Sequence, residues 1–352
     1  MTTDNSGSIK GMASPRPYHT CRRLVILAPN WLGDAVMALP AIADVRRALP
    51  ESSISVAARS AIAPLFEIVE GVDAVVTLPS GKLRNPLAGC GFAAALLLPN
   101  SLHSAFLAAR ARIPERWGYR TDGRGPLLTR TVDATRDGHQ VEYYRRLVKQ
   151  LGFENGPGEP RLAVPASARE EADAALTSAG WNGVNPLVAL APGAAYGGAK
   201  RWPPESFAAL AADLGRDGVH TLMVGSGADR ATADAVQSAF ETVRAQRSHE
   251  RTLHDVVGRT SLAALAGVFA RCRTLVTNDS GAMHLAAAVG IPVTAVFGPT
   301  NEKATRPAGN VHTIVTHDTW CRPCMLRECP LDHECMRGVA VAPVASAARA
   351  YL

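Results

Sequence analysis

Short apolar runs alternate with amphipathic helical patterns along most of this chain. Residues 23–28 and 186–190 are mostly apolar, which is typical of strands buried in a parallel sheet. Apolar positions at helical spacing follow each run, over residues 35–49 and 205–216, and predict helices with one buried face. This alternation predicts an α/β protein, and a length of 352 residues suggests two domains.

The chain is expected to divide into four parts. Residues 1–20 are rich in small polar residues and lack the apolar core of a signal peptide, so a disordered N-terminal tail is predicted. Residues 21–165 are predicted to form the first domain, because the Gly- and Pro-rich stretch 154–160 marks its end. Residues 166–338 form the predicted second domain, and 339–352 a closing helix that could pack back on the first.

The sequence gives no sign of a membrane-spanning helix. The longest apolar stretches, 92–98 and 285–297, are short or interrupted by Gly290 and Pro292. A soluble, cytoplasmic protein is therefore expected. The net charge of +6 is too modest to indicate a nucleic-acid partner.

The most informative motif begins where an apolar run ends in Asn278-Asp279-Ser280-Gly281 and a helical pattern starts. A strand that turns directly into a helix leaves several backbone N–H groups free, and the helix dipole there favours negative charge. The motif therefore predicts a phosphate-binding turn. The alternative is that Asp279 or Ser280 only caps the helix.

Two further loops follow strand-like runs. In the first, Gly33 and Asp34 precede a helix, and Asp34 is either a functional carboxylate at the edge of a crevice or a helix N-terminal charge. The second, residues 191–203, is rich in small residues whose amides could wrap a ligand, and its Lys200 could reach a diphosphate. By itself Lys200 could equally be a solvated surface lysine.

Taken together and in this order, these motifs resemble the lipopolysaccharide heptosyltransferases, glycosyltransferase family 9. The resemblance is greatest to the heptosyltransferase II subfamily and rests on residues 29–34, 200–203, 278–281 and the cysteine-rich stretch 321–336. It implies the GT-B fold, in which two Rossmann-like domains face each other across a cleft.

The resemblance implies an inverting transfer of L-glycero-D-manno-heptose from ADP-heptose to the first heptose of the lipopolysaccharide inner core. The acceptor hydroxyl needs a base, for which Asp34 is the candidate, and the leaving ADP needs a positive charge, for which Lys200 is the candidate. Two alternatives stay open: transfer to Kdo, as in heptosyltransferase I, and a catalytically idle protein that binds a nucleotide sugar. Retention of both residues argues against the idle protein.

The resemblance also implies two sets of binding residues. An acidic residue is expected to hold the adenosine ribose, and Asp229 is the only one near the expected turn. Asp279 is expected to contact the heptose hydroxyls or to orient the phosphate-binding turn, and His284, one helical turn further on, either reaches that site or is a core histidine. For the donor the candidates are Gly33, Ala194, Ala195, Lys200, Asp229, Asp279, Ser280, Gly281 and His284, and for the acceptor they are Asn30, Trp31, Arg120 and Arg124.

Positive charge gathers in one part of the first half. Seven arginines and three acids lie from Arg110 to Arg136, and a fourth acid, Asp137, follows directly. Such a run is usually a solvated face, but arginine also matches the carboxylates and phosphates of a Kdo-lipid A acceptor. Because that acceptor is a lipid, transient contact with the inner face of the cytoplasmic membrane is expected.

Four of the seven cysteines, Cys321, Cys324, Cys329 and Cys335, lie close together in the sequence. Their spacing would suit a structural zinc ion. The alternative is a set of reduced thiols that pack as small apolar groups. The resemblance brings no metal requirement, so we expect no metal and no other cofactor.

Overall fold

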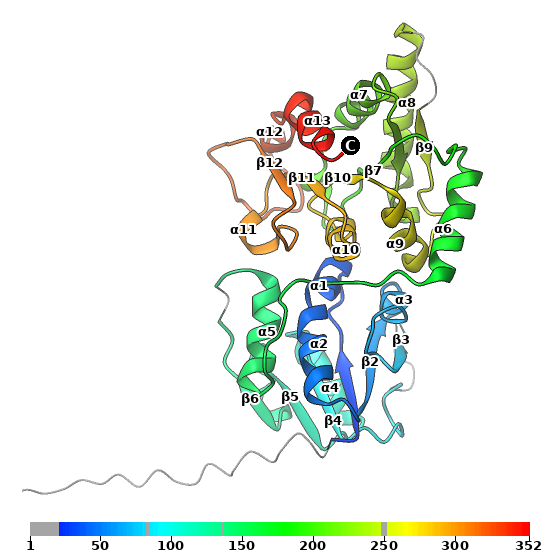
Figure 1. The fold of residues 1–352 in the computed structure, drawn as a ribbon. Coiled ribbons are helices and arrows are strands. Elements are labelled where there is room, and N and C mark those ends of the chain that lie inside the picture. Colours follow the sequence, from blue (N-terminus) through cyan, green and yellow to red (C-terminus); the bar gives the residue numbers. More distant parts are fainter. Residues whose placement is uncertain (1–20, 80, 82–84, 136, 248–251) are drawn as a thin grey trace, which may run out of the picture.

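The computed structural model describes residues 21–79, 81, 85–135, 137–247 and 252–352 (Figure 1). The predicted N-terminal tail and Arg136 of the arginine run lie outside these residues. Two α/β bodies lie one above the other in Figure 1, and the extended stretch after α5 passes between them.

The first body is built on a parallel six-stranded sheet in the order β3-β2-β1-β4-β5-β6. Its strands are β1 (Arg23–Leu27), β2 (Ser53–Arg59), β3 (Ala74–Leu78), β4 (Ala94–Leu97), β5 (Glu115–Tyr119) and β6 (Arg130–Val132). Its helices are α1 (Leu32–Met37), α2 (Leu39–Ala48), α3 (Ala63–Phe66), α4 (Leu102–Arg110) and α5 (Gln140–Gln150).

The second body repeats this plan with a parallel sheet in the order β12-β11-β10-β7-β8-β9. Its strands are β7 (Leu187–Ala191), β8 (His220–Met223), β9 (Leu253–Asp255), β10 (Thr274–Asn278), β11 (Val293–Phe297) and β12 (Thr313–Thr316). Its helices are α6 (Ala166–Ser178), α7 (Pro204–Gly215), α8 (Arg230–Arg247), α9 (Leu262–Arg271), α10 (Gly281–Val289), α11 (Glu302–Thr305), α12 (Glu334–Arg337) and α13 (Val341–Arg349).

Both sheets have the strand order of a Rossmann fold, which confirms the predicted α/β architecture. In such a sheet the strand order reverses between the first and fourth strands, and ligands bind beyond the carboxyl ends of the strands at that point. Here those strands are β1 and β4 in one sheet and β7 and β10 in the other. The fold therefore provides two ligand-binding edges.

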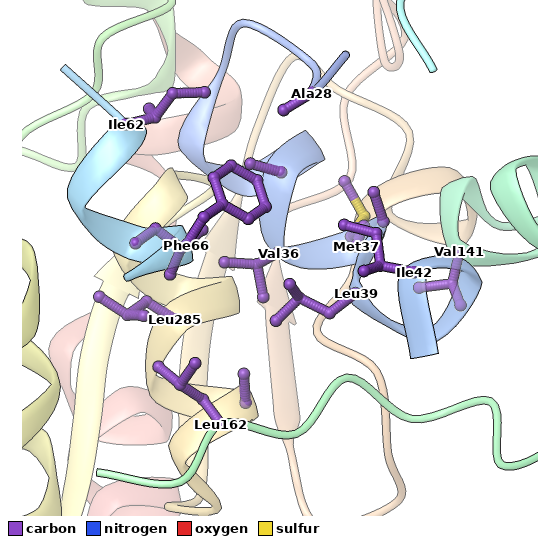
Figure 2. Packing of buried hydrophobic residues seen from close by; sticks show 14 of the residues in the cluster. Ala28, Val36, Met37, Leu39, Ile42, Ile62, Phe66, Val141, Leu162 and Leu285 are labelled. Atoms are coloured by element: carbon purple, nitrogen blue, oxygen red, sulfur yellow. The ribbon is translucent and has the colours of Figure 1, made fainter. Parts of the chain in front are cut away.

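The two bodies share an apolar core where they meet. Figure 2 shows Phe66 of α3 and Val36 of α1 beside Leu285 of α10, and all three belong to one buried cluster. Leu162, from the connecting stretch, lies in the same cluster and donates its backbone N–H to the carbonyl of Ala288 at 2.8 Å. The bodies are thus held together by continuous packing as well as by the chain.

A buried ion pair between Asp44 of α2 and Arg145 of α5 holds the start of the connecting stretch on the first body. The N–H of Gly156 donates to Oδ1 of Asp44 at 2.9 Å, and its carbonyl accepts from Nη2 of Arg145 at 2.5 Å. Asp44 is fully buried. Both backbone groups of one linker residue are therefore fixed by α2 and α5.

The closing helix α13 packs on the second body, against α7, β10 and β11, rather than back on the first. It covers one face of that sheet together with α7. Among the described residues, no helix is long and apolar enough to cross a membrane.

Candidate active site

Two of the predicted loops belong to the second body and one to the first, and all three lie at the points where the strand order reverses. Asp34 follows β1, Lys200 follows β7, and Asp279 follows β10. The short helix α1, which carries Asp34, packs directly against α10, which starts just after Asp279. The fold thus brings the three predicted loops to one place.

Asp34 lies in the first turn of α1 and is half-buried. The hydroxyl of Tyr144, on α5, points at its Oδ1 atom from 3.5 Å. Burial raises the pKa of Asp34, while the Tyr144 hydroxyl and the charge of Lys200 act to lower it and Asp279 acts to raise it. A carboxylate of the first body therefore lies within the field of two charged groups of the second.

Lys200 and Asp279 form an ion pair, with 2.5 Å between Nζ and Oδ2. Both side chains are largely buried, at 11% and 7% exposure. The same oxygen of Asp279 accepts a hydrogen bond from the Thr300 hydroxyl at 2.7 Å, and Nζ of Lys200 lies 4.6 Å from the centre of the Tyr196 ring. The lysine charge is thus held in place from two sides.

The loop after β7 is fixed by a buried asparagine. Asn278 donates from Nδ2 to the carbonyl of Pro192 at 2.8 Å and accepts at Oδ1 from the N–H of Trp202 at 3.0 Å. Trp202 is fully buried and donates its indole N–H to the carbonyl of Val339 at 2.9 Å. These contacts clamp both ends of the loop that carries Lys200.

The N-terminus of α10 is left without a side-chain cap. Ser280 occupies the N-cap position, but its hydroxyl pairs with that of Thr277 at 3.1 Å instead of capping the helix. The first N–H groups of α10 therefore keep their capacity to bind an anion.

Two glycines allow α1 and α10 to approach closely. A Cβ atom on Gly33 would lie 2.8 Å from the ring of His284, and one on Gly281 would lie 2.8 Å from Cβ of Leu32. His284 is buried, and burial lowers its pKa to about 4. This histidine lies in the contact between the two bodies and is neutral at pH 7.

The remaining donor candidates lie around the same loop. Ala194 is buried and Ala195 is exposed. Asp229 accepts hydrogen bonds from the N–H and hydroxyl of Ser226 at 2.9 and 2.8 Å, and it packs against Gly193. Its carboxylate thus stabilises its own turn, and its contact with a ribose stays a prediction.

The acceptor candidates differ in accessibility. Asn30 and Trp31 are exposed at the end of β1, with Trp31 at 52%. Arg120 is exposed and paired with Asp133 at 2.8 Å. Arg124, in contrast, is fully buried and donates to the carbonyl of Tyr119 at 2.8 Å and, at 3.0 Å, to the hydroxyl of Ser104.

Burial lowers the pKa of Arg124 to about 10. Its guanidinium also donates to the carbonyl of Pro99, so it ties together the chain that follows β4 and β5. Arg124 is fully buried and supports the chain at this edge of the first sheet.

The four clustered cysteines are free thiols, with Cys335 buried and Cys321, Cys324 and Cys329 half-buried. Burial and the three neighbouring thiols raise the pKa of Cys335. Across the described ranges, no group of three or more His, Cys, Asp or Glu side chains is arranged to hold a metal ion.

A hollow of about 1160 Å³ lies elsewhere at the junction, between α2, the connecting stretch 157–163 and residues 308–312. None of the predicted site residues lines it.

Sequence reasoning did not find Tyr144, Tyr196 and Thr300 as members of the site. Thr300 follows β11 at the same carboxyl edge, so the rule that found Asp279 could have found it. Tyr144 lies 110 residues from its partner on an ordinary amphipathic helix, and no local signal marks it.

Residues 80–334 match the family described as Glycosyltransferase family 9 (heptosyltransferase). A Haemophilus ducreyi protein named Lipooligosaccharide heptosyltransferase 2 is 30% identical over 316 residues, or 83% of this chain and 88% of that protein. Lipopolysaccharide heptosyltransferase 2 of Salmonella typhimurium is 28% identical over 309 residues, or 83% and 87%.

The structure of E. coli ADP-heptose lps heptosyltransferase II is similar over 94% of this chain and 98% of that one. The TM-score is 0.80 and the sequence identity is 26%. This similarity confirms the GT-B arrangement that the sequence motifs led us to expect.

Proposed function

Because this chain belongs to glycosyltransferase family 9, the heptosyltransferases, we propose that it transfers L-glycero-D-manno-heptose from ADP-heptose to the first heptose of the lipopolysaccharide inner core. The relatives described above are named for the second heptosyltransferase, which supports this acceptor over Kdo. The observation that carries the proposal is the position of Asp34, on the first body, within the field of Lys200 and Asp279 on the second.

In this proposal the second body holds the donor. Lys200 and the uncapped N–H groups at Gly281 bind the diphosphate, because both present positive charge at the end of β7 and β10. Amides of Ala194 and Ala195 line the same loop, and Asp229 contacts the ribose. Asp279 orients Lys200 through their ion pair.

The first body binds the acceptor and activates it. Asn30, Trp31 and Arg120 are exposed at its carboxyl edge and contact the sugar and its charged groups. Arg124 has a positioning role, because it is buried and holds the chain around Pro99 and Tyr119 that forms this edge.

The chemical step is a single displacement. Asp34 accepts the proton of the acceptor hydroxyl while that oxygen attacks the anomeric carbon of the heptose. The bond from the anomeric carbon to the β-phosphate oxygen breaks, and ADP leaves with the electron pair. Lys200 stabilises the charge on the departing diphosphate, and attack from the opposite face inverts the anomeric configuration.

A raised pKa suits Asp34 to this role, since a carboxylate with a higher pKa is a stronger base. We propose that the reaction uses no metal ion, because Lys200 and the α10 amides supply the positive charge. The enzyme acts in the cytoplasm, at the inner face of the membrane that carries the acceptor.

The test is ADP release from ADP-heptose in EDTA, with acceptors that end either in Kdo or in one heptose. Release with the heptose-terminated acceptor alone is expected. Release with the Kdo-terminated acceptor would move the assignment to the first transfer, and donor binding without release would support the idle protein.

Asp34→Asn is expected to lower kcat by about 10²- to 10⁴-fold and to leave ADP-heptose affinity within a few-fold, because it removes the base and little of the donor site. Asp217→Asn is the matched control. Asp217 lies just before β8, at the amino ends of the strands, whereas the site lies at their carboxyl ends. Unchanged turnover in Asp34→Asn would remove Asp34 from the mechanism.

A further inference from the structure

The stretch between β12 and α12 lies at the left of Figure 1. It exposes large apolar side chains. Residues 320–331 of this stretch, here called the apolar segment, include Trp320 at 84% exposure, Leu331 at 60%, Met325 at 53% and Leu326 at 44%. Ten large apolar side chains are exposed among all the described residues, and four of them fall within these twelve positions. A local concentration of exposed apolar side chains indicates an interaction surface, whereas exposed apolar side chains scattered singly do not.

The apolar segment is tied to the loops of the candidate active site. The N–H of Met325 donates to the carbonyl of Pro299 at 2.8 Å, and its carbonyl accepts from the Tyr196 hydroxyl at 3.0 Å. The carbonyl of Arg327 accepts from the N–H of Ala199 at 3.0 Å, next to Lys200. The exposed side chains are therefore displayed from a fixed backbone beside the donor loop.

The charges around the apolar segment favour an anionic partner. Arg201, Lys303 and Arg327 are exposed, and none of them pairs with a carboxylate among the described residues. The neighbouring carboxylates are mostly engaged: Glu302 and Asp318 pair with Arg322, Asp332 with Arg337, and Glu328 accepts from the N–H of Gly198. Beyond this stretch, Glu334, the first residue of α12, has no such partner in the described part of the chain.

We propose that the apolar segment docks this enzyme on an anionic phospholipid bilayer. Tryptophan, methionine and leucine beside cations that pair with no carboxylate fit the boundary between headgroups and acyl chains. The proposal rests on the proposed function, which places the acceptor sugar on a lipid in that bilayer. Docking through this segment brings Lys200 and the donor to the membrane surface where the acceptor lies.

The test is flotation of the full chain with phosphatidylcholine vesicles, with and without phosphatidylglycerol. The wild type is expected to bind the anionic vesicles, and added salt is expected to weaken binding. The double variant Trp320→Ser/Leu331→Ser is expected to lose about tenfold in vesicle affinity, because two interfacial side chains are gone. Val184→Ser is the matched control, since Val184 is 85% exposed in the same half of the chain and lies outside the apolar segment.

A second measurement does not depend on the double variant. Brominated acyl chains are expected to quench the fluorescence of the wild type, and Trp320→Phe is expected to lose that quenching. Wild type that fails to bind anionic vesicles, or a double variant that binds like wild type, overturns the proposal.

Transfer to a delipidated core oligosaccharide separates this proposal from the proposed function. Trp320→Ser/Leu331→Ser is expected to act on that soluble acceptor at the wild-type rate. If the wild type transfers heptose to it without binding vesicles, the docking proposal alone fails. If vesicles bind through the segment and no acceptor is used, the proposed function fails.

Discussion

At the scale of single residues, the site depends on Asp34, whose carboxylate must be a strong enough base and still be ionised. Burial raises the pKa of Asp34, and the Tyr144 hydroxyl and Lys200 oppose that rise. Tyr144 is itself buried, and burial next to Asp34 raises its own pKa well above the usual value. The tyrosine therefore stays protonated and can only donate to the carboxylate.

Tyr144→Phe is expected to shift the acidic limb of the kcat/KM profile to higher pH. Loss of the hydroxyl removes a donor that favours the charged form of Asp34, so more of the base is protonated at a given pH. At 3.5 Å the bond is weak, about 0.5–1 kcal/mol, so activity on the acidic side should fall about two- to fivefold.

Tyr143→Phe is the control for this shift, because the Tyr143 hydroxyl donates to Oδ1 of Asn100 at 2.9 Å. A profile of Tyr144→Phe that overlays the wild type would show that the hydroxyl does not act on the base.

Sequence reasoning reached most of these residues through their position after strands. Asp34, Lys200 and Asp279 each follow an apolar run, and parallel strands bring their carboxyl ends to one edge. Arg124 shows the limit of that reasoning. Its neighbours in the sequence indicate a basic surface, but folding buries it among the carbonyls of Pro99 and Tyr119.

At the scale of elements, the contact between α1 and α10 sets the distance between the two halves of the site. Glycines at Gly33 and Gly281 remove the side chains that would separate the helices. The sequence identified both glycines, but it could not show that each meets the opposite helix. That pairing depends on how the two bodies pack, which has no local signal.

Gly33→Ala is expected to lower the free energy of unfolding by about 1–3 kcal/mol, because the new methyl group would overlap the buried ring of His284. Transfer activity should fall with it, since Asp34 is the next residue. Chemical denaturation and the ADP-release assay measure the two effects.

Gly227→Ala provides the comparison, because a Cβ atom there meets nothing within 4 Å. Equal stability of the two alanine variants would mean that α1 and α10 can separate without cost.

At the scale of the whole molecule, the two bodies share one core and a buried histidine between them. The pKa of His284 falls to about 4 from an ordinary value near 6.5, so the unfolded chain binds a proton more readily than the folded one between these values. The contribution of His284 to the free energy of unfolding is fully present above pH 6.5 and is lost as the pH falls towards 4. Asp34 acts in the opposite direction, because its pKa is raised on folding.

His284→Gln is therefore expected to flatten the dependence of unfolding free energy on pH between 6.5 and 4. The wild type should lose up to about 3 kcal/mol across this range from His284, with Asp34 offsetting part of it. Denaturant titrations at several pH values measure the slope. His103→Gln, on the exposed side of α4, should keep the wild-type slope, and an equally steep slope in His284→Gln would contradict the assignment.

The ion pair of Lys200 with Asp279 affects the release of the product ADP. A lysine that binds a diphosphate strongly enough to assist its departure could also retain the product. Here a buried carboxylate, fixed by the Thr300 hydroxyl, stands 2.5 Å from the same ammonium and competes for it. As ADP loosens, Asp279 can take over the lysine charge, so product release does not leave a buried cation without a partner.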